Sequence, residues 1–245
     1  MEFSAASDSG KVRTHNEDSF ALVPFSTGVL LAVADGVGGS QAGEVASAIA
    51  TRTFRERLLR HQQQPPQTAP LRDALEMANE RILAARQESS RQAGMGTTMT
   101  CAWLSEELLA YAHVGDSRLY LMREGKLTCI THDHSVAQEL VRQGSIPAAE
   151  AERHPQRHVL TRWLGFETFD CDEGTLALEP GDVVLLCTDG LVSALSESEI
   201  AREMGDGFAG VALRLVEAAN RAGGPDNITV VAARTTASDE RGEQP

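Results

Sequence analysis

The chain has 245 residues, and its 22 Lys and Arg against 35 Asp and Glu give a formal net charge of −13. That charge, with aromatic residues at only 4%, argues against a nucleic-acid-binding protein and against a protein that docks on an anionic membrane surface. It leaves open a cluster of carboxylates that holds cations, and the length allows one large domain or two small ones.

The first half of the chain is predicted to contain a buried strand followed by two helices. Residues Val29–Ala34 form a short aliphatic run that ends in an Asp-Gly pair, as expected for a strand closed by a tight turn. Small apolar side chains recur at helical spacing over Ala42–Ala50, and a second helical stripe runs over Leu71–Ala85. The Gln- and Pro-rich segment His61–Pro70 is predicted to be a mobile polar connection.

The second half is richer in strands. Six short apolar segments are predicted strands, namely residues 98–104, 108–114, 117–122, 127–130, 183–187 and 228–233. A third helical stripe over Phe208–Ala219 is ended by Gly223-Gly224-Pro225. The polar stretch 133–164 is predicted to be a flap over a site, and residues 235–245 to be a disordered tail. Strands in succession with helices in pairs predict one α+β layered domain over residues 1–234.

Cysteine usage and the N-terminus bear on the cellular compartment. Cys101, Cys129, Cys171 and Cys187 form no CxxC pair, so they are predicted to be reduced structural residues without a disulfide framework or a zinc site. The N-terminus lacks the basic and apolar regions of a signal peptide, and no apolar run approaches the roughly 20 residues of a membrane span. The sequence therefore predicts a soluble, cytoplasmic protein.

Acidic residues stand where predicted strands begin or end, each beside Gly, Asn or a second acid. They are Glu17, Asp18, Asp35, Asp116, Asp189 and Asp226. A carboxylate at the end of a buried strand is costly unless something compensates its charge. Several such ends meeting at one edge of a sandwich would form an oxygen-rich cage of the kind that Mg²⁺ and Mn²⁺ prefer, while the absence of clustered His and Cys argues against zinc or copper.

Each of these motifs also has a purely structural interpretation. Either Asp-Gly pair alone is typical of a turn after a strand. Asp116 is close enough in sequence to Arg118 for a local ion pair, and Asp226 with Asn227 could be an ordinary loop. His132 and His134 flank an aspartate at the start of the predicted flap, and a structural role is favoured over metal binding for them.

Taken in order, eight motifs resemble the metal-dependent protein phosphatase family, type 2C, in its compact stand-alone bacterial form. They are Asp8-Ser9-Gly10 with Arg13 and Asn16-Glu17-Asp18; Val33 to Gly39 with Gly43-Glu44; Met95-Gly96-Thr97-Thr98; His113 to Arg118; Asp133-His134-Ser135; Leu160-Thr161-Arg162; Thr188-Asp189-Gly190-Leu191; and Gly224 to Thr229. The motifs keep the family's order and extend over residues 8–229, nearly the whole chain. The resemblance implies a four-layer α-β-β-α sandwich with a central antiparallel β-sandwich.

The resemblance also implies a two-metal site for Mn²⁺ or Mg²⁺. In such a site Asp35 would bridge both ions, Asp189 and Asp226 would complete the first ion's ligands, and the Gly36 carbonyl would bind the second. Glu17 and Asp18 would orient metal-bound waters, and Asp116 with Asp189 would form a third, weaker site seen in bacterial members. Arg13 would hold the substrate phosphate with its planar, always-charged fork. A hydroxide between the two ions would then attack phosphorus.

One position departs from the pattern of many animal and plant members of the family. Those members carry a His directly after the Asp-Gly pair, proposed to protonate the leaving oxygen, whereas this chain has Val37, as do many bacterial relatives. Two donors remain open at this point. One is a water on a metal ion, such as a third ion near Asp116. The other is His15, whose alternative role is that of a solvated histidine on a strand.

The function predicted from the resemblance is hydrolysis of phosphoserine and phosphothreonine in proteins. The expected partners are substrates of a cognate Ser/Thr kinase, including the kinase itself, with no nucleic acid or membrane partner and a monomeric chain. A non-catalytic phosphate- or metal-sensing module on the same fold is the alternative, although the metal-bridging acids Asp35, Asp189 and Asp226 are all present. Hydrolysis of small phosphoesters with low selectivity is a third possibility.

Overall fold

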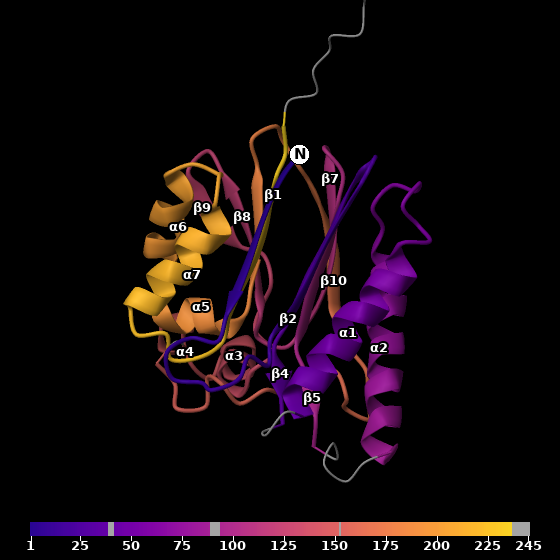
Figure 1. The fold of residues 1–245 in the computed structure, drawn as a ribbon. Helices are drawn as coiled ribbons and strands as arrows, with labels where there is room; N and C mark the ends of the chain where they lie inside the picture. The colour runs from indigo at the N-terminus through magenta and orange to yellow at the C-terminus, as the bar shows by residue number, and fades with distance from the viewer. Residues whose placement is uncertain (39–41, 89–93, 152, 237–245) are drawn as a thin grey trace, which may run out of the picture.

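The computed structural model describes residues 1–38, 42–88, 94–151 and 153–236. Two five-stranded antiparallel sheets lie face to face in the middle of the molecule, and helices cover the outer face of each sheet (Figure 1). This arrangement confirms the predicted four-layer α-β-β-α sandwich.

The strands of the two sheets come from both ends of the chain. The first sheet has the order β1 (Glu2–Asp8), β12 (Ile228–Arg234), β11 (Val183–Cys187), β8 (Arg118–Arg123), β9 (Lys126–Cys129). The second has the order β10 (Asp172–Ala177), β7 (Leu108–Val114), β6 (Met99–Leu104), β3 (Gly28–Ala34), β2 (Ser19–Phe25). A two-residue pair, β4 (Gly36–Val37) and β5 (Gly96–Thr97), extends beyond the end of the second sheet.

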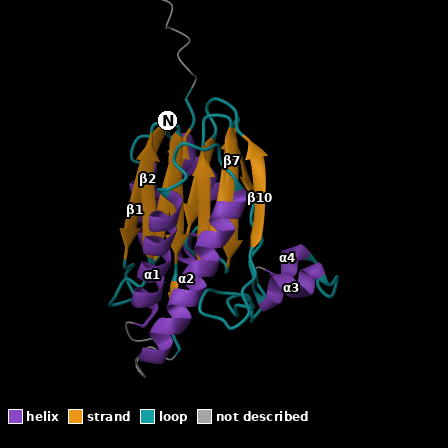
Figure 2. Cartoon of the chain, turned by 90° about the vertical axis from the view of Figure 1, so that its right-hand side faces the viewer, coloured by secondary structure: helices purple, strands orange, loops and turns teal. Residues whose placement is uncertain are grey.

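The helices form the two outer layers and part of the predicted flap, residues 133–164. Helices α1 (Ala42–Leu58) and α2 (Thr68–Glu88) cover the second sheet (Figure 2). Helices α5 (Asp189–Ala194), α6 (Glu197–Gly205) and α7 (Val211–Arg221) lie against the first sheet. The short helices α3 (Val136–Arg142) and α4 (Ala148–Ala151) stand apart from the sandwich, within the stretch predicted to be a flap.

Both faces of the central strands are buried, which explains why those strands appear as continuous apolar runs. In β3, Val29 and its alternate neighbours face the other sheet, whereas Leu30 and its alternates pack beneath α1 and α2. In β12, Val231 faces the second sheet and Val230 packs beneath the α5–α7 layer. Three apolar layers thus stabilise the four-layer stack, and the strand ends remain free to carry polar side chains.

The structure extends or changes several predictions. Helix α1 continues to Leu58, beyond the predicted Ala50, and no described helix is long and apolar enough to cross a membrane. Thr235, the first residue after the predicted boundary at residue 234, is buried, and its N–H donates to the Asp182 carbonyl. The rest of the predicted tail, residues 237–245, lies outside the described residues, as does Gly39 of the second motif.

Candidate active site

The predicted acids gather at one end of the sandwich, where the chain crosses from one sheet to the other. Asp35 follows β3 of the second sheet, while Asp189 follows β11 of the first and Asp226 precedes its neighbour β12. Asp116 lies in the crossing from β7 to β8, and Glu17 lies in the crossing from β1 to β2. Antiparallel pairing places the end of β11 beside the start of β12, so acids far apart in sequence become neighbours.

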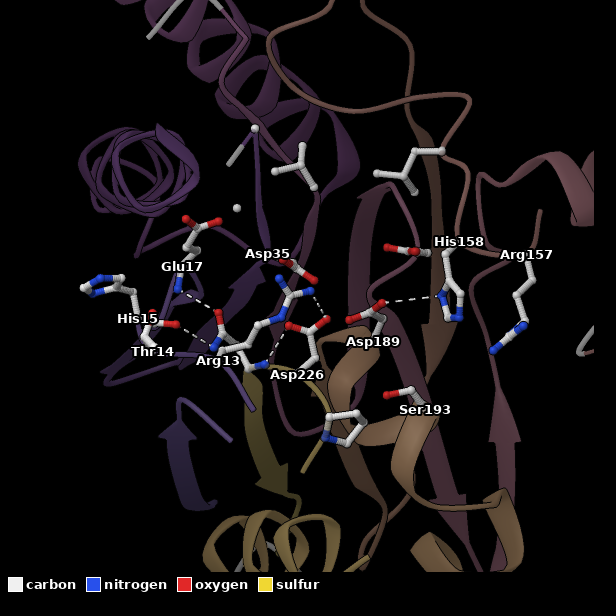
Figure 3. Close-up of a pocket in the computed structure, with 17 residues that line it drawn as sticks. Arg13, Thr14, His15, Glu17, Asp35, Arg157, His158, Asp189, Ser193 and Asp226 are labelled. Atoms are coloured by element: carbon white, nitrogen blue, oxygen red, sulfur yellow. Dashed lines mark hydrogen bonds and ion pairs between the residues drawn. The ribbon is translucent and has the colours of Figure 1, made fainter. Parts of the chain in front are cut away.

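These acids line a pocket of about 860 Å³ (Figure 3). Of the residues predicted for the site, the pocket is lined by Arg13, Glu17, Asp35, Gly36, Asp116, Asp189 and Asp226. Asp18 does not line it. Its Oδ2 accepts a hydrogen bond from the Thr188 hydroxyl (2.8 Å), which places this carboxylate against the residue that precedes Asp189.

The electrostatics of the cluster are unfavourable for carboxylates alone. Burial, with the negative charges of Asp189, Asp18 and Asp116, raises the pKa of Asp35 well above its usual range. Burial and Asp189 likewise raise the pKa of Asp116. Burial also raises the pKa of Asp18 to about 7. Each shift has the same cause, because ionised acids are held close together in a place that water reaches poorly.

Two observations indicate that the cluster fits divalent cations. Among the described residues, Asp189 Oδ1 and Asp18 Oδ1 are buried oxygens with no hydrogen-bond partner, and a buried anionic oxygen is expected to have one. A bound cation would neutralise the mutual repulsion of the acids. Most of the donors are carboxylate oxygens, the ligands that Mg²⁺ and Mn²⁺ prefer. The residues present therefore fit the metal ions that the sequence predicts.

Arg13 reaches into the pocket from the long crossing loop between β1 and β2. Its Nη2 donates to Asp226 Oδ2 (2.8 Å), and this bond with the charge of Asp226 raises the pKa of the guanidinium. The Arg13 side chain is 57% exposed, so it lies at the mouth of the pocket rather than beneath it. The exposed Arg13 guanidinium lies beside carboxylates that fit divalent cations. It is therefore suitably placed to bind an anion that also contacts those cations.

The structure also places residues in the pocket that sequence reasoning did not single out. His158, from the flap, faces Asp189 across the pocket from Arg13, with its Nδ1 3.8 Å from Asp189 Oδ2 (Figure 3). Ligand atoms of Asp116, His158 and Asp189 all lie within 4.8 Å of one another. No motif at fixed spacing joins these three residues, so only the fold could reveal His158.

Several structural interpretations of single residues can now be decided. Arg118 pairs with Asp133 through both of its Nε and Nη2 donors (2.9 and 2.8 Å) and not with Asp116. His134 has a structural role, because its Nδ1 accepts a hydrogen bond from the Gly115 N–H (3.2 Å). His15 is exposed in the crossing loop, outside any strand.

The segment before Asp116 is supported by a second buried histidine. His113 is fully buried, with Nδ1 2.8 Å from the Thr100 hydroxyl and Nε2 donating to the His132 carbonyl (3.1 Å). Its ring packs 4.7 Å from that of His134. Burial, with the proximity of His134, lowers the pKa of His113 to about 3.

This lowered pKa predicts a pH-dependent loss of stability. The unfolded chain binds a proton at His113 below pH about 6.5 and the folded chain does not, so stability falls as the pH drops from that value towards 3. Compared with His113→Gln, the wild type should lose about 2 kcal/mol of unfolding free energy between pH 7.5 and pH 5.0, as measured by urea denaturation. A difference between the two proteins that does not change with pH would mean that His113 keeps an ordinary pKa in the fold.

Comparison with known proteins identifies the family. The family model described as protein phosphatase 2C matches residues 10–222. The chain is 40% identical over 250 residues to the serine/threonine protein phosphatase PstP of Mycobacterium tuberculosis, covering 100% of this chain and 47% of PstP, so it spans about half the length of that relative. It is 36% identical to the protein phosphatase PhpP of Streptococcus pneumoniae, covering 94% of this chain and 96% of PhpP. The chain belongs to the protein phosphatase 2C family.

Solved structures agree with this assignment. The crystal structure of the Mycobacterium tuberculosis phosphatase PstP superposes with a TM-score of 0.86 at 38% identity, covering 96% of this chain and 98% of that one. The catalytic domain of PstP in complex with two manganese ions superposes with a TM-score of 0.83 at 36% identity, covering the same shares of the two chains.

Proposed function

We propose that this protein is a Mn²⁺- or Mg²⁺-dependent phosphatase that hydrolyses phosphoserine and phosphothreonine in proteins. The observation that carries the proposal is that the half-buried carboxylates of Asp35, Asp189 and Asp226 line one pocket, where burial and the neighbouring acids raise the pKa of Asp35 and of Asp189, with Arg13 at the mouth of the same pocket. Membership of the protein phosphatase 2C family and the two manganese ions of the PstP catalytic domain support it.

Each side chain then has a role that its position allows. Asp35, Asp189, Asp226 and the Gly36 carbonyl would hold two ions, which supply an activated water and neutralise charge on the phosphoryl oxygens. Arg13 would bind two oxygens of the phosphate with its planar fork. Asp18, held by Thr188, and Glu17 would orient groups beside the ions.

The leaving oxygen requires a proton from a group other than residue 37, because that position is Val37, on β4. His15 lines the pocket and remains one hypothesis for the donor, the other being water beside Asp116. His15 is exposed on the loop that carries Arg13, so its ring has access to the pocket mouth.

Phosphorylated proteins are the proposed partners, including a cognate Ser/Thr kinase, and the site has space for a flanking chain. A groove of about 650 Å³ between the flap and the α5–α6 segment shares Asp116, His158 and Asp189 with the catalytic pocket. A substrate whose phosphate sits at Arg13 could therefore continue along this groove. We further propose that the protein acts as a monomer in the bacterial cytoplasm.

Phosphate release from a phosphothreonine peptide, titrated with Mn²⁺ and repeated with EDTA, tests this function. Turnover that requires the metal supports the phosphatase. A folded protein that binds Mn²⁺ but releases no phosphate would instead support the sensing module. Equal or higher kcat/KM on small phosphoesters than on phosphopeptides would indicate the low-selectivity hydrolase.

We also propose that His158 adds a ligand to a third cation site formed by Asp116 and Asp189. If so, His158→Ala should weaken the weakest Mn²⁺-binding event in a calorimetric titration about tenfold and leave the tighter events unchanged. His154→Ala is a matched control, because His154 also lies in the flap but its Nδ1 accepts from the Gln156 N–H and it does not line the pocket. Identical titrations of wild type and His158→Ala would exclude His158 as a ligand.

A further inference from the structure

The Asn227 side chain is a buried amide that binds three backbone groups of one loop. Its Nδ2 donates to the carbonyls of Ser9 (3.0 Å) and His15 (2.9 Å), and its Oδ1 accepts from the Glu17 N–H (2.8 Å). Asn227 is 6% exposed, so these bonds are largely shielded from water. Both amide protons and the amide oxygen are therefore used, and all three partners belong to the crossing between β1 and β2.

That crossing, residues 9–18, carries Arg13 and has no helix or strand of its own. Its conformation must be held by contacts with other parts of the chain. The Lys11 N–H donates to the Gly224 carbonyl (2.8 Å), and a Cβ at Gly10 would overlap the Asp226 carbonyl oxygen. Asn227 bonds at residues 9, 15 and 17, on both sides of Arg13, so its amide spans the part of the loop that presents the guanidinium.

We propose that Asn227 is a positioning residue that sets the place of Arg13, and so the binding of the substrate phosphate, without being required for metal binding. This inference rests on the proposed function, because it assumes that Arg13 holds the phosphate. Asn227 would thus fix the loop that carries Arg13, whereas its neighbour Asp226 would bind a metal ion.

The chemistry of the three partners requires an amide. Two carbonyl oxygens need donors and one N–H needs an acceptor, which matches the two protons and one oxygen of asparagine. A carboxylate at this position would face the carbonyls of Ser9 and His15 with negative oxygens, and an alanine would remove the hydrogen bonds of all three backbone groups. Both changes would loosen the loop that carries Arg13.

The orientation of Asp226, the proposed metal ligand next in sequence, does not depend on the Asn227 side chain. Asp226 Oδ1 accepts from the backbone N–H of residue 227 (2.9 Å), a bond that any side chain except proline preserves. A variant that loses the amide therefore keeps the contact that orients the Asp226 carboxylate. Phosphate binding and metal binding should separate in such a variant.

A double-mutant cycle with Arg13 tests the proposal. Asn227→Ala should lower kcat/KM on a phosphothreonine peptide about 10- to 100-fold, mainly through a rise in KM. If Asn227 acts through Arg13, the same change made in Arg13→Ala should alter kcat/KM less than about threefold. Multiplicative losses in the double variant would overturn the proposal.

Two further measurements separate this proposal from a general loss of structure. Mn²⁺ affinity, measured by calorimetry, should stay within about threefold of wild type in Asn227→Ala, and a parallel loss of metal affinity would overturn the proposal. Hydrogen exchange should rise in residues 9–18 and not in β12. Hydrogen exchange needs no turnover, so it tests whether the Asn227 amide fixes the loop even if the wild type has no phosphatase activity. In that case the proposed function is wrong, and the exchange result still decides the role of Asn227 in the loop.

A matched variant and a gentler one complete the design. Asn79→Ala removes another buried asparagine that binds backbone groups, because its Nδ2 donates to the Phe166 carbonyl (3.1 Å) and its Oδ1 accepts from the Gly165 N–H (2.6 Å); these partners lie outside residues 9–18, so the change should leave KM unchanged. Asn227→Asp keeps the acceptor for Glu17 and the side-chain shape, so it serves if Asn227→Ala does not fold. It should reproduce the rise in KM, and a wild-type KM in Asn227→Asp would overturn the proposal.

Discussion

Asp35→Asn should remove metal-dependent phosphate release while stabilising the metal-free protein. Activity should fall at least about 10³-fold, because the proposed bridging carboxylate is lost and metal catalysis supplies several kcal/mol. In EDTA at pH 7.5 the variant should unfold at a higher temperature than wild type. The reason is that burial and the neighbouring acids oppose an ionised Asp35, whereas an amide carries no charge and can donate to Asp189.

Thermal unfolding of both proteins, with EDTA and with saturating Mn²⁺, checks this expectation. Mn²⁺ should raise the Tm of wild type and have little effect on the Tm of Asp35→Asn. Asp73→Asn makes the same chemical change at an exposed position of α2 and should change neither activity nor Tm. A lower Tm for Asp35→Asn in EDTA would contradict the idea that the acid cluster is strained without cations.

Gly190→Ala should disrupt the junction between two proposed metal ligands, Asp189 and Asp226. A Cβ at residue 190 would overlap the backbone carbonyl oxygen of Asn227 and lie 2.9 Å from its carbonyl carbon. The start of α5, which carries Asp189, and the segment just before β12, which carries Asp226, would have to move apart. We expect a loss of about 1–3 kcal/mol of unfolding free energy, a Tm lower by about 2–6 °C, and Mn²⁺ affinity reduced about tenfold.

Gly205→Ala is the matched control for this prediction. Gly205 also lies in a helix, α6, but a Cβ there would meet nothing within 4 Å. Its replacement should therefore leave Tm and Mn²⁺ titrations near those of wild type. Wild-type stability and metal affinity in Gly190→Ala would show that the two strand ends can separate without harm to the site.

Local sequence patterns predicted the β3, β7 and β11 strands within a residue or two, because their apolar runs are short and bounded by turn residues. They did not specify β1 or β10. Those two strands are edge strands with mixed burial, so their side chains give no clear apolar pattern. Strand β1 is defined by its pairing with β12 at the other end of the chain, which no local window contains.

At the site, the Asp189-Gly190 pair also depends on a contact with a distant segment that local sequence patterns do not reveal. As a sequence it is typical of a tight turn, and the structure instead begins α5 there, at Asp189. The glycine is explained by the close approach of the Asn227 carbonyl, a contact between residues 37 positions apart by number. That Asp189 is a metal ligand stays a prediction, and the structural reason for Gly190 was not visible in the sequence.

The sequence by itself determined which residue types could hold cations and bind phosphate, since carboxylates at strand ends and one nearby arginine express that chemistry directly. It also determined the order of the main strands and helices, through their periodicity. Only the tertiary structure decided that His158 of the flap faces Asp189 and that Asn227 holds the loop of Arg13. Those roles depend on segments that sheet pairing and chain crossings bring close together in space. Separation along the sequence does not reveal which segments become neighbours.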